Sequence, residues 1–387
     1  MASDLWIERI TLSNFRNYTT ATVETGPEPV ILIGENGSGK TNLLEAVSLL
    51  APGQGMRRAA FADLARADGD GRWAISAHVH TPNGQVEIGT GVVQPPSGRE
   101  RSGRQVRIDG DNKGGSGVLA DYIELVWVTP AMDGLFTGSA GDRRRFFDRL
   151  VLCFDPAYRT RIGHFERAMQ SRNKLLSQGS YHPTQLDSLE RIMAETGVAI
   201  AAARVEVCTA LAGVIAARHS RDESSPFPWS ELTLDGTLEQ DIANATAAAV
   251  DIEDRYAQTL RFMRDRDGAA GRTLEGPHRT DLAVAHGPKG LAAKLCSTGE
   301  QKALLLGLVL AHAELLTERQ GGRAPLMLLD EITAHFDDLR RSALFKEILH
   351  LGAQAWMTGT DTFGFKSLKG SARAFVVSDG RIAATKL

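Results

Sequence analysis

Over its first third the chain alternates short apolar or period-two segments with polar turns, a pattern typical of β-strands. The strands predicted in this part are residues 5–12, 20–24, 30–33, 73–78, 85–93, 105–109 and 123–128. Asn83-Gly84 and Asp109-Gly110 are dipeptides typical of hairpin turns. Residues 94–117 are crowded with Gly, Pro, Ser and Arg, so we expect hairpins there with an arginine-bearing surface loop.

The pattern changes to helical spacing after residue 142. From residue 143 to about 267 glycines are few and apolar residues recur every three or four positions, with breaks at 181–184 and 222–230. No heptad repeat is sustained over several turns, so we do not expect a long coiled coil. From residue 274 onward, strands and helices alternate to the end. We therefore predict one α/β unit, residues 1–142 and 268–387, interrupted by a helical insertion at 143–267.

The most informative motif lies between the predicted strand 30–33 and the helical pattern that follows it. Residues 34–41 read Gly-Glu-Asn-Gly-Ser-Gly-Lys-Thr, which fits G-x-x-x-x-G-K-[ST] at every fixed position. Strand, glycine loop and helix in this order surround a phosphate with backbone N–H groups. Lys40 is expected to reach the β- and γ-phosphates, and the Thr41 hydroxyl to bind Mg²⁺. The alternative is a glycine-rich turn that binds nothing, but motif and context together favour a nucleoside triphosphate.

A second element of a nucleotide site follows at residues 325–331, Pro-Leu-Met-Leu-Leu-Asp-Glu. The apolar run predicts a strand buried on both faces, and ligands gather at the carboxyl ends of parallel strands. Asp330 is expected to hold Mg²⁺ together with Thr41, and Glu331 to orient or deprotonate the attacking water. A strand that ends in two exposed acids would give the same string. The upstream loop favours catalysis by Glu331, Asp330 and Lys40.

A third element, residues 295–302, precedes a strongly apolar helix predicted at 303–316. It contains two overlapping capping-box spacings, Ser297-x-x-Glu300 and Thr298-x-x-Gln301. A purely structural account is therefore available, worth about 1 kcal/mol of helix stability. The same helix N-terminus offers hydrogen-bond donors and a positive dipole to a phosphate. Since Lys40 already occupies one side of the γ-phosphate, a second anion site is best explained if it closes over ATP bound to another copy.

Composition bounds the class of protein. The chain has 387 residues, 42% hydrophobic and 24% charged, as is ordinary for a soluble globular protein. Its three cysteines lie far apart with no C-x-x-C, so a reducing compartment and no metal site are expected. No secretory signal is visible and residues 303–316 are too short to span a bilayer, so we expect a cytoplasmic protein without a membrane partner. The net charge of −3 means that any nucleic-acid contact must be local.

The order of a phosphate-binding loop, a late S-x-G-[EQ]-Q element and an acidic strand resembles the ATPase heads of the ABC class. Within that class the chain most closely resembles the RecF family, bacterial recombination-repair ATPases related to SMC and Rad-type heads. The segments that carry this resemblance are Leu12-Ser13-Asn14-Phe15-Arg16-Asn17-Tyr18, residues 34–44, Arg143-Arg144-Arg145-Phe146-Phe147-Asp148 and Gly276-Pro277-His278-Arg279-Thr280-Asp281. They spread over nearly the whole chain. The implied fold is an ABC/SMC-type α/β head with a β-rich N-terminal lobe and an inserted helical arm domain.

The resemblance also implies roles for the matching positions. Nucleotide would be contacted by Arg16, Asn17, Gly34, Asn36, Gly37, Ser38, Gly39, Lys40, Thr41 and Asn42. The signature element, which would contact the γ-phosphate held by the opposite subunit, comprises Ser297, Gly299, Glu300 and Gln301. Asp337 would lie across the dimer interface, and Thr358 or Thr360 would take the switch position. Transporter ATPases have a histidine at that position, so this chain fits the RecF-like group better.

Two segments depart from the family pattern. The turn at residues 333–337 is bulkier than the usual S-x-L-D, and residues 129–133 lack the acid that normally follows the proline. These departures concern the dimer interface and the lid segment, and they leave nucleotide binding unaffected. Cys296, beside the signature, is expected to be a small buried residue and not a redox switch, because no neighbour in sequence suggests a lowered thiol pKa.

Arginine clusters are the candidates for DNA contact. The residues singled out are Arg143, Arg144, Arg145, Arg261 and Arg264, and the same clusters contain Arg149, Arg255, Arg266 and Arg272. Most arginines on helix surfaces are solvated or paired within the chain. ATP-driven pairing would double such a patch across a two-fold axis, which allows a mildly acidic protein to hold a polyanion.

The resemblance therefore implies a weak, DNA-stimulated ATPase that binds ATP and Mg²⁺ and dimerises on ATP. The homodimer would clamp gapped DNA or single-strand to duplex junctions. It would recruit RecR, and indirectly RecO and RecA, in recombinational repair, replication restart and SOS induction. The alternative is an ABC-type ATPase that acts on a non-DNA cargo. That alternative shares every nucleotide motif, but it predicts a switch histidine and a membrane partner groove, and no N-F-R-N-Y opening.

Overall fold

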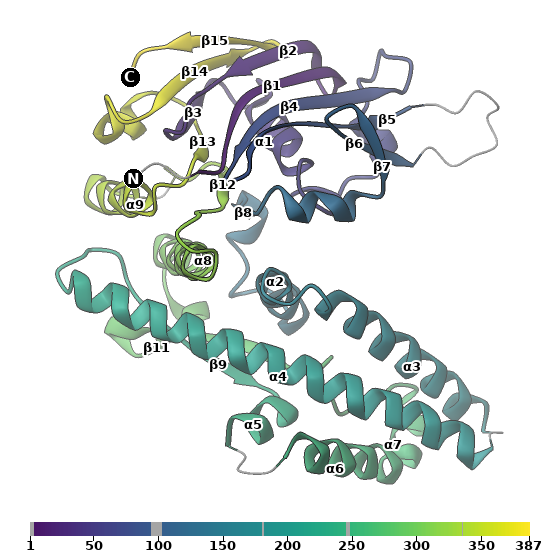
Figure 1. The fold of residues 1–387 in the computed structure, drawn as a ribbon. Helices are drawn as coiled ribbons and strands as arrows, with labels where there is room; N and C mark the ends of the chain where they lie inside the picture. The colour runs from purple at the N-terminus through teal and green to yellow at the C-terminus, as the bar shows by residue number, and fades with distance from the viewer. Residues whose placement is uncertain (1–3, 94–102, 180–181, 245–247, 335) are drawn as a thin grey trace. The chain divides into compact units, whose positions relative to one another are not determined.

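The structure, a computed structural model, describes residues 4–93, 103–179, 182–244, 248–334 and 336–387. The described chain forms two compact units, whose elements are labelled in Figure 1. Unit 1 contains Met1–Asp133, Ser224–Phe227 and Leu305–Leu387, and unit 2 contains Gly134–Glu223 and Pro228–Leu304. The predicted domain bounds differ from these: residues 134–142 and 268–304, which we assigned to the head, group with the helical segment.

Unit 1 contains an antiparallel six-stranded sheet, here called sheet A, in the order β2-β1-β4-β5-β6-β7. Its strands are β1 (Trp6–Phe15), β2 (Tyr18–Glu24), β4 (Trp73–Thr81), β5 (Gly84–Val92), β6 (Arg104–Ile108) and β7 (Asp111–Gly114). The strands predicted in this region are confirmed. Asp109 and Gly110 join β6 to β7 with positive φ of 49° and 87°, as a two-residue type I′ hairpin requires. Residues 94–102 of the predicted arginine-bearing loop lie outside the described residues.

The second sheet of unit 1, sheet B, has six strands in the order β15-β14-β3-β13-β12-β8. They are β3 (Val30–Ile33), β8 (Leu125–Val128), β12 (Leu326–Leu329), β13 (Ala355–Gly359), β14 (Arg373–Ser378) and β15 (Arg381–Thr385). All neighbours are parallel except β14 and β15. Gly359 pairs with Ile33, and Leu329 with Met357, so β3, β13 and β12 end within two residues of one another. The residues that follow these strands therefore meet at one edge of the sheet.

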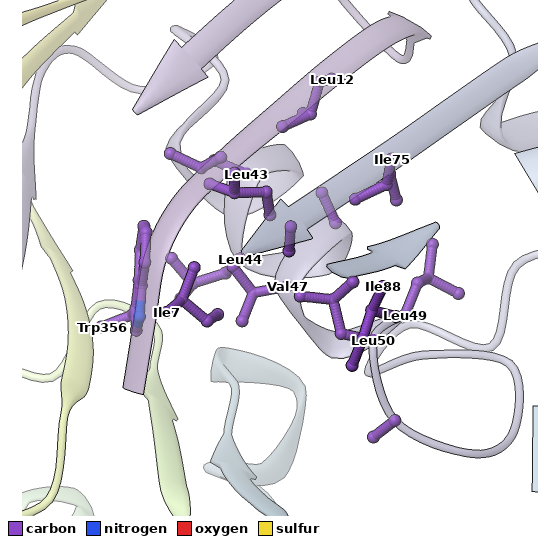
Figure 2. Packing of buried hydrophobic residues seen from close by; sticks show 14 of the residues in the cluster. Ile7, Leu12, Leu43, Leu44, Val47, Leu49, Leu50, Ile75, Ile88 and Trp356 are labelled. Atoms are coloured by element: carbon purple, nitrogen blue, oxygen red, sulfur yellow. The ribbon is translucent and has the colours of Figure 1, made fainter. Parts of the chain in front are cut away.

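Helix α1 (Lys40–Ser48) packs against both sheets through an apolar face. Leu43, Leu44 and Val47 are fully buried, as Figure 2 shows, in a cluster with residues of sheet A and with Trp356 of β13. Burying each such side chain stabilises the fold by roughly 1.5–3 kcal/mol. This packing fixes the helix that begins at Lys40 relative to both sheets.

The remaining elements of unit 1 complete the α/β pattern. Helix α8 (Thr298–Arg319) continues into unit 1 from residue 305, and α9 (Asp338–Leu351) packs on the short 3-10 turn η6 (Phe363–Leu368) through Phe345 and Phe365. Other 3-10 turns are η1 (Phe61–Leu64), η2 (Ser116–Asp121) and η3 (Pro130–Met132). The predicted order of helix, strand, helix and strand after residue 303 is confirmed.

Unit 2 is mainly helical. Its helices are α2 (Ala140–Leu152), α3 (Tyr158–Gln178), α4 (Pro183–Arg221), α5 (Thr237–Asn244), α6 (Ala249–Phe262) and α7 (Arg264–Ala270). It also has a small sheet in the order β11-β10-β9, made of β9 (Ser230–Asp235), β10 (Asp281–His286) and β11 (Leu291–Ala292), with 3-10 turns η4 (Gly287–Lys289) and η5 (Ala293–Leu295). The prediction of helix up to residue 267 is wrong for β9, because pairing with β10 decides the conformation of this short segment.

Two buried arginines hold unit 2 together. Arg172 donates to Glu190 (3.0 Å), to Asp267 (2.6 Å) and to the carbonyl of Leu260. Arg204 donates to Asp148 (2.9 Å), to Glu239 (2.9 Å) and to the carbonyl of Pro277. Buried guanidinium groups need such partners because desolvation of an unpaired charge is costly. These hydrogen bonds join segments that are far apart in sequence.

Helix α4 has 39 residues and, alone among the helices within the described ranges, is long and apolar enough to cross a membrane. Half of its most apolar window is buried inside the protein, and it packs against α3, α5 and α6. Its buried residues include Glu190 and Arg204, both in ion pairs. These features are those of the central helix of a folded unit.

Candidate nucleotide site

The phosphate-binding loop predicted at residues 34–41 connects β3 to α1. Gly37 and Gly39 have φ of 84° and 114°, a region that glycine enters without a steric penalty. A Cβ at Gly39 would lie 2.5 Å from Asn17 Nδ2, and one at Gly34 would lie 2.2 Å from the carbonyl oxygen of Val377. The conformation and the packing of this loop therefore both require glycine at these positions. The buried Ser38 hydroxyl has no hydrogen-bond partner within the described part of the chain.

Lys40 is the first residue of α1, and its side chain folds back onto the phosphate-binding loop. Its ammonium group donates to the carbonyl oxygens of Gly34 (2.6 Å) and Glu35 (2.7 Å). Burial lowers the pKa of Lys40, and the nearby carboxylates of Glu331 and Asp330 partly offset this by raising it. The loop and the two acids therefore contribute to one electrostatic environment, as predicted from their positions at the ends of β3 and β12.

Thr41 and Asp330 are brought together by the parallel sheet. The Thr41 hydroxyl donates to Asp330 Oδ1 at 3.1 Å, although the two residues are 289 positions apart. Thr358 donates to the same carboxylate oxygen at 2.7 Å, and its hydroxyl accepts the backbone N–H of Glu331 at 2.7 Å. Asp330 and Thr358 are buried, whereas Glu331 is exposed and has φ of 51°. The predicted switch residue Thr358 therefore holds the Asp330 carboxylate and the backbone of Glu331. Thr360, its alternative, bonds Asp361 on the surface.

The turn between β1 and β2 supports the phosphate-binding loop. Asn17 donates to the Ser38 carbonyl (3.1 Å) and accepts from Asn42 (2.8 Å), and the Tyr18 hydroxyl donates to the Gly39 carbonyl (2.9 Å). The N-F-R-N-Y segment is thus adjacent to the loop, as the resemblance implied. Asn36, by contrast, is exposed at the tip of the loop.

Arg16 makes a bidentate pair with the fully buried Glu45 of α1, at 2.8 and 2.9 Å, and is itself only partly exposed. Arg57 lies 3.6 Å from the same carboxylate and donates to Asn42 at 3.0 Å. Glu45 and Arg57 were missed from the sequence, and Tyr18 was named there only as part of the N-F-R-N-Y segment, without a role. Glu45 could have been suspected, because an acid on the buried face of an amphipathic helix needs a cationic partner.

The signature element forms the first of its two predicted capping boxes. Ser297 Oγ accepts from the Glu300 N–H at 3.4 Å, and Glu300 accepts from the Ser297 N–H at 3.1 Å and from Lys289 at 2.5 Å. The hydrogen bond from Lys289, with those from Ser297, lowers the pKa of Glu300 to about 2. The second box does not form, since Gln301 donates to the Cys296 carbonyl instead. Residues 297–301 belong to unit 2, whereas the phosphate-binding loop belongs to unit 1.

Two further predicted positions have local structural roles. Asp337 is exposed and caps α9 by accepting the Arg340 N–H at 2.8 Å. His335, in the bulky turn before it, lies outside the described residues. Cys296 is only partly buried, whereas a buried residue was predicted, and burial together with Glu300 raises the pKa of its thiol.

The arginines singled out for DNA contact all have partners within unit 2. Arg143 is bidentate to Asp281 (2.7 Å), Arg144 donates to the Thr280 carbonyl, and Arg145 pairs with Asp142. Arg261 pairs with Asp187, and Arg264 with Asp187 and Glu190. Of the five, only Arg145 and Arg261 keep more than half of the side chain exposed, 59% and 62%. Arg143 and Arg264 therefore act mainly as structural residues of unit 2.

The motif 143–148 packs against the motif 276–281. Arg143 and Arg144 reach Asp281 and Thr280, and Arg204 joins Asp148 to Pro277. A Cβ at Gly276, whose φ is 131°, would lie 2.0 Å from the Tyr256 hydroxyl. The two motifs that resemble the family in this part of the chain thus form the centre of one unit.

The fold and the loop at the end of β3 define a class, the ABC/SMC-type ATPase heads, and the predicted fold is confirmed by comparison. The model of the RecF/RecN/SMC N terminal domain matches residues 6–358. The chain resembles an SMC head domain from Pyrococcus furiosus with a TM-score of 0.56, at 15% identity over 99% of this chain and 96% of that one.

Relatives with higher sequence identity identify one family within this class. A "DNA replication and repair protein RecF" of Mesorhizobium japonicum is 50% identical over all of both chains, and that of Brucella suis is 51% identical over 97% of this chain and 95% of its own. The structure of "the recombination mediator protein RecF-ATPrS in RecFOR pathway" has a TM-score of 0.81, at 22% identity over 99% of each chain. The chain belongs to the RecF family.

Proposed function

We propose that this chain binds ATP between the phosphate-binding loop and the acidic strand and hydrolyses it slowly. The observation that carries the proposal is the hydrogen bond between Thr41 and Asp330, which joins the two halves of the predicted site across 289 residues. Lys40 and the backbone N–H groups of residues 34–41 would bind the β- and γ-phosphates. Glu331, exposed at the same edge, would orient the attacking water or accept its proton.

The Thr41 hydroxyl and the Asp330 carboxylate also fit Mg²⁺. Both are oxygen donors, which this hard cation prefers, and their 3.1 Å contact places them side by side. Mg²⁺ bound there would neutralise charge on the β- and γ-phosphates. Thr358 would keep the Asp330 carboxylate oriented, because its hydroxyl bonds the same oxygen as Thr41.

The proposal includes dimerisation on ATP. The signature residues Ser297, Gly299, Glu300 and Gln301 lie at the N-terminus of α8, a helix end that favours an anion. In a two-fold dimer this element would contact the γ-phosphate held by the partner, with Asp337 at the interface. ATP would then stabilise the closed dimer because it binds that state more tightly than the open one.

Family membership supports a role in DNA metabolism. The relatives' printed name, "DNA replication and repair protein RecF", leads us to propose that the ATP-bound dimer binds DNA at gaps or single-strand to duplex junctions. DNA would stimulate its weak ATPase activity. We further propose that it acts in the cytoplasm with RecR, and through it with RecO and RecA, in recombinational repair, replication restart and SOS induction.

Two variants test the nucleotide switch. Glu331→Gln should accumulate an ATP-dependent dimer, because it leaves the phosphate contacts intact and removes the group that assists hydrolysis. Lys40→Met should abolish the dimer, because it removes a cation from the γ-phosphate. Light scattering at saturating ATP gives the mass of each, and Lys174→Met, at an exposed position of α3, is the matched control. A monomeric Glu331→Gln variant under these conditions would refute the proposed dimer.

A further inference from the structure

Phe262 is an exposed aromatic residue at the end of α6. It is 86% exposed, the highest value of any large apolar side chain within the described ranges. The apolar face of α6 is buried without it, through Ile252, Tyr256 and Leu260. Phe262 therefore contributes nothing to the core of unit 2. Its ring is therefore accessible for stacking on a ligand.

Two arginines flank Phe262 in sequence. Arg255 precedes it by seven positions on α6, which places the two on the same side of that helix. Arg266 follows it by four positions and lies on α7, which begins at Arg264 after Met263. Both are exposed, and within the described residues neither has a carboxylate in ion-pair distance. The contact of Arg266 is a weak one, 4.0 Å from Met263 Sδ. The neighbouring Arg261 and Arg264 differ, because Asp187 and Glu190 neutralise them.

The surroundings of Phe262 favour a planar, anionic ligand over an apolar protein surface. The exposed residues next to it, Gln258 and Thr259 on α6 and Asp265 on α7, are all polar. The other exposed apolar residue of α6, Val250, is 12 positions away, about 18 Å along the axis. A single ring between two unpaired guanidinium groups lacks the contiguous apolar area of a protein interface. It has the two components of single-strand recognition, a stacking platform and cations for the backbone.

We infer that Phe262, Arg255 and Arg266 form a binding site for unpaired nucleotides on α6 and α7. Phe262 stacks on one base, and the two arginines bind neighbouring phosphates, Arg255 about 10 Å away along the axis of α6 and Arg266 from the start of α7. Duplex DNA does not offer this ligand, because its bases are already stacked on one another. The inference rests on the proposed DNA binding and extends it by assigning the single-stranded part of a gap to this surface.

The test compares two oligonucleotides of equal length, one of thymidylate and one with abasic sites in place of the bases. Binding of each to the full chain with ATP is measured by fluorescence anisotropy. Phe262→Ala should weaken binding of the thymidylate strand about tenfold to a hundredfold and leave the abasic strand unchanged. Phe262→Trp should bind both strands as the unaltered protein does. Val250→Ala, on the same helix, is the matched control and should change neither.

The arginines are tested by salt dependence. Affinity falls as salt rises, and a plot of log affinity against log salt has a negative slope. Arg255→Gln and Arg266→Gln should each make this slope shallower by about 0.7 on both strands, since each removes one phosphate contact. Equal thymidylate binding by Phe262→Ala and the unaltered chain would overturn the inference and leave the proposed DNA binding intact. An equal loss on both strands would also overturn it, since stacking requires a base. If the unaltered chain binds neither strand but binds a gapped duplex with ATP, the inference fails and the proposed DNA binding stands; if it binds no gapped duplex either, both fail.

Discussion

The side chain of Thr358 offers a sharp test of how this site is held together. Its hydroxyl donates to Asp330 Oδ1 and accepts the Glu331 N–H, both at 2.7 Å, and the residue is fully buried. Thr358→Val has almost the same shape and removes only the hydroxyl. The substitution therefore isolates the two hydrogen bonds from the packing of β13.

The magnitude follows from the groups left behind. The Asp330 carboxylate loses a charge-assisted hydrogen bond, worth roughly 1.5–3 kcal/mol. The Glu331 N–H loses its partner, which costs about 1–3 kcal/mol if water does not replace it. Because Glu331 is exposed, water recovers part of the second cost. We expect the free energy of unfolding to fall by about 2–4 kcal/mol.

The catalytic effect has a separate cause. Glu331 has φ of 51°, a strained conformation for a residue with a Cβ, and its N–H is held by Thr358. Without that bond the backbone can relax and move the carboxylate away from the attacking water. We expect the single-turnover rate of ATP hydrolysis to fall at least about tenfold, equivalent to about 1.4 kcal/mol in the barrier.

The assay pairs urea unfolding with single-turnover hydrolysis, and Thr358→Ser is the control. Serine keeps the hydroxyl and loses one methyl group, so it should unfold about 1 kcal/mol more easily and hydrolyse ATP at nearly the original rate. If Thr358→Val matched the unaltered chain in urea midpoint and in rate, the two contacts would not hold the acids, and this reasoning would be wrong.

Two further predictions concern unit 2. Arg204→Met should lower the free energy of unfolding by about 3–5 kcal/mol, because it leaves two acids without their buried partner, whereas Arg145→Met, at a mostly exposed pair, should change it by less than about 1 kcal/mol. Urea unfolding curves of both variants check this, and equal losses would contradict it. Glu300 has its pKa lowered to about 2 in the folded chain, so its contribution to stability is present above its ordinary pKa and lost as the pH falls toward 2. The stability difference between the unaltered chain and Glu300→Gln should therefore be constant above about pH 5 and shrink below it, and a difference that does not change with pH would argue against the Lys289 and Ser297 contacts.

The strands and helices of unit 1 could be predicted because their signals are local. The buried run Val30–Ile33, the glycines of the loop and the apolar face of α1 each follow from neighbouring residues, through period, backbone freedom and burial. The family motifs are local in the same sense. β9 was missed because its six residues sit inside a long helical pattern, and only β10, about 50 residues later, gives it a partner.

The sequence by itself therefore determined the class of fold, the phosphate-binding loop and the acidic strand. It did not determine which side chains meet. The tertiary structure decided three such contacts. Thr358 holds Asp330, Glu45 binds Arg16, and Arg143 pairs with Asp281 instead of remaining free for DNA. The physical reason is that a charged or hydroxyl group is stabilised by whichever partner the topology brings within about 3 Å, and chain neighbours carry no information about that partner.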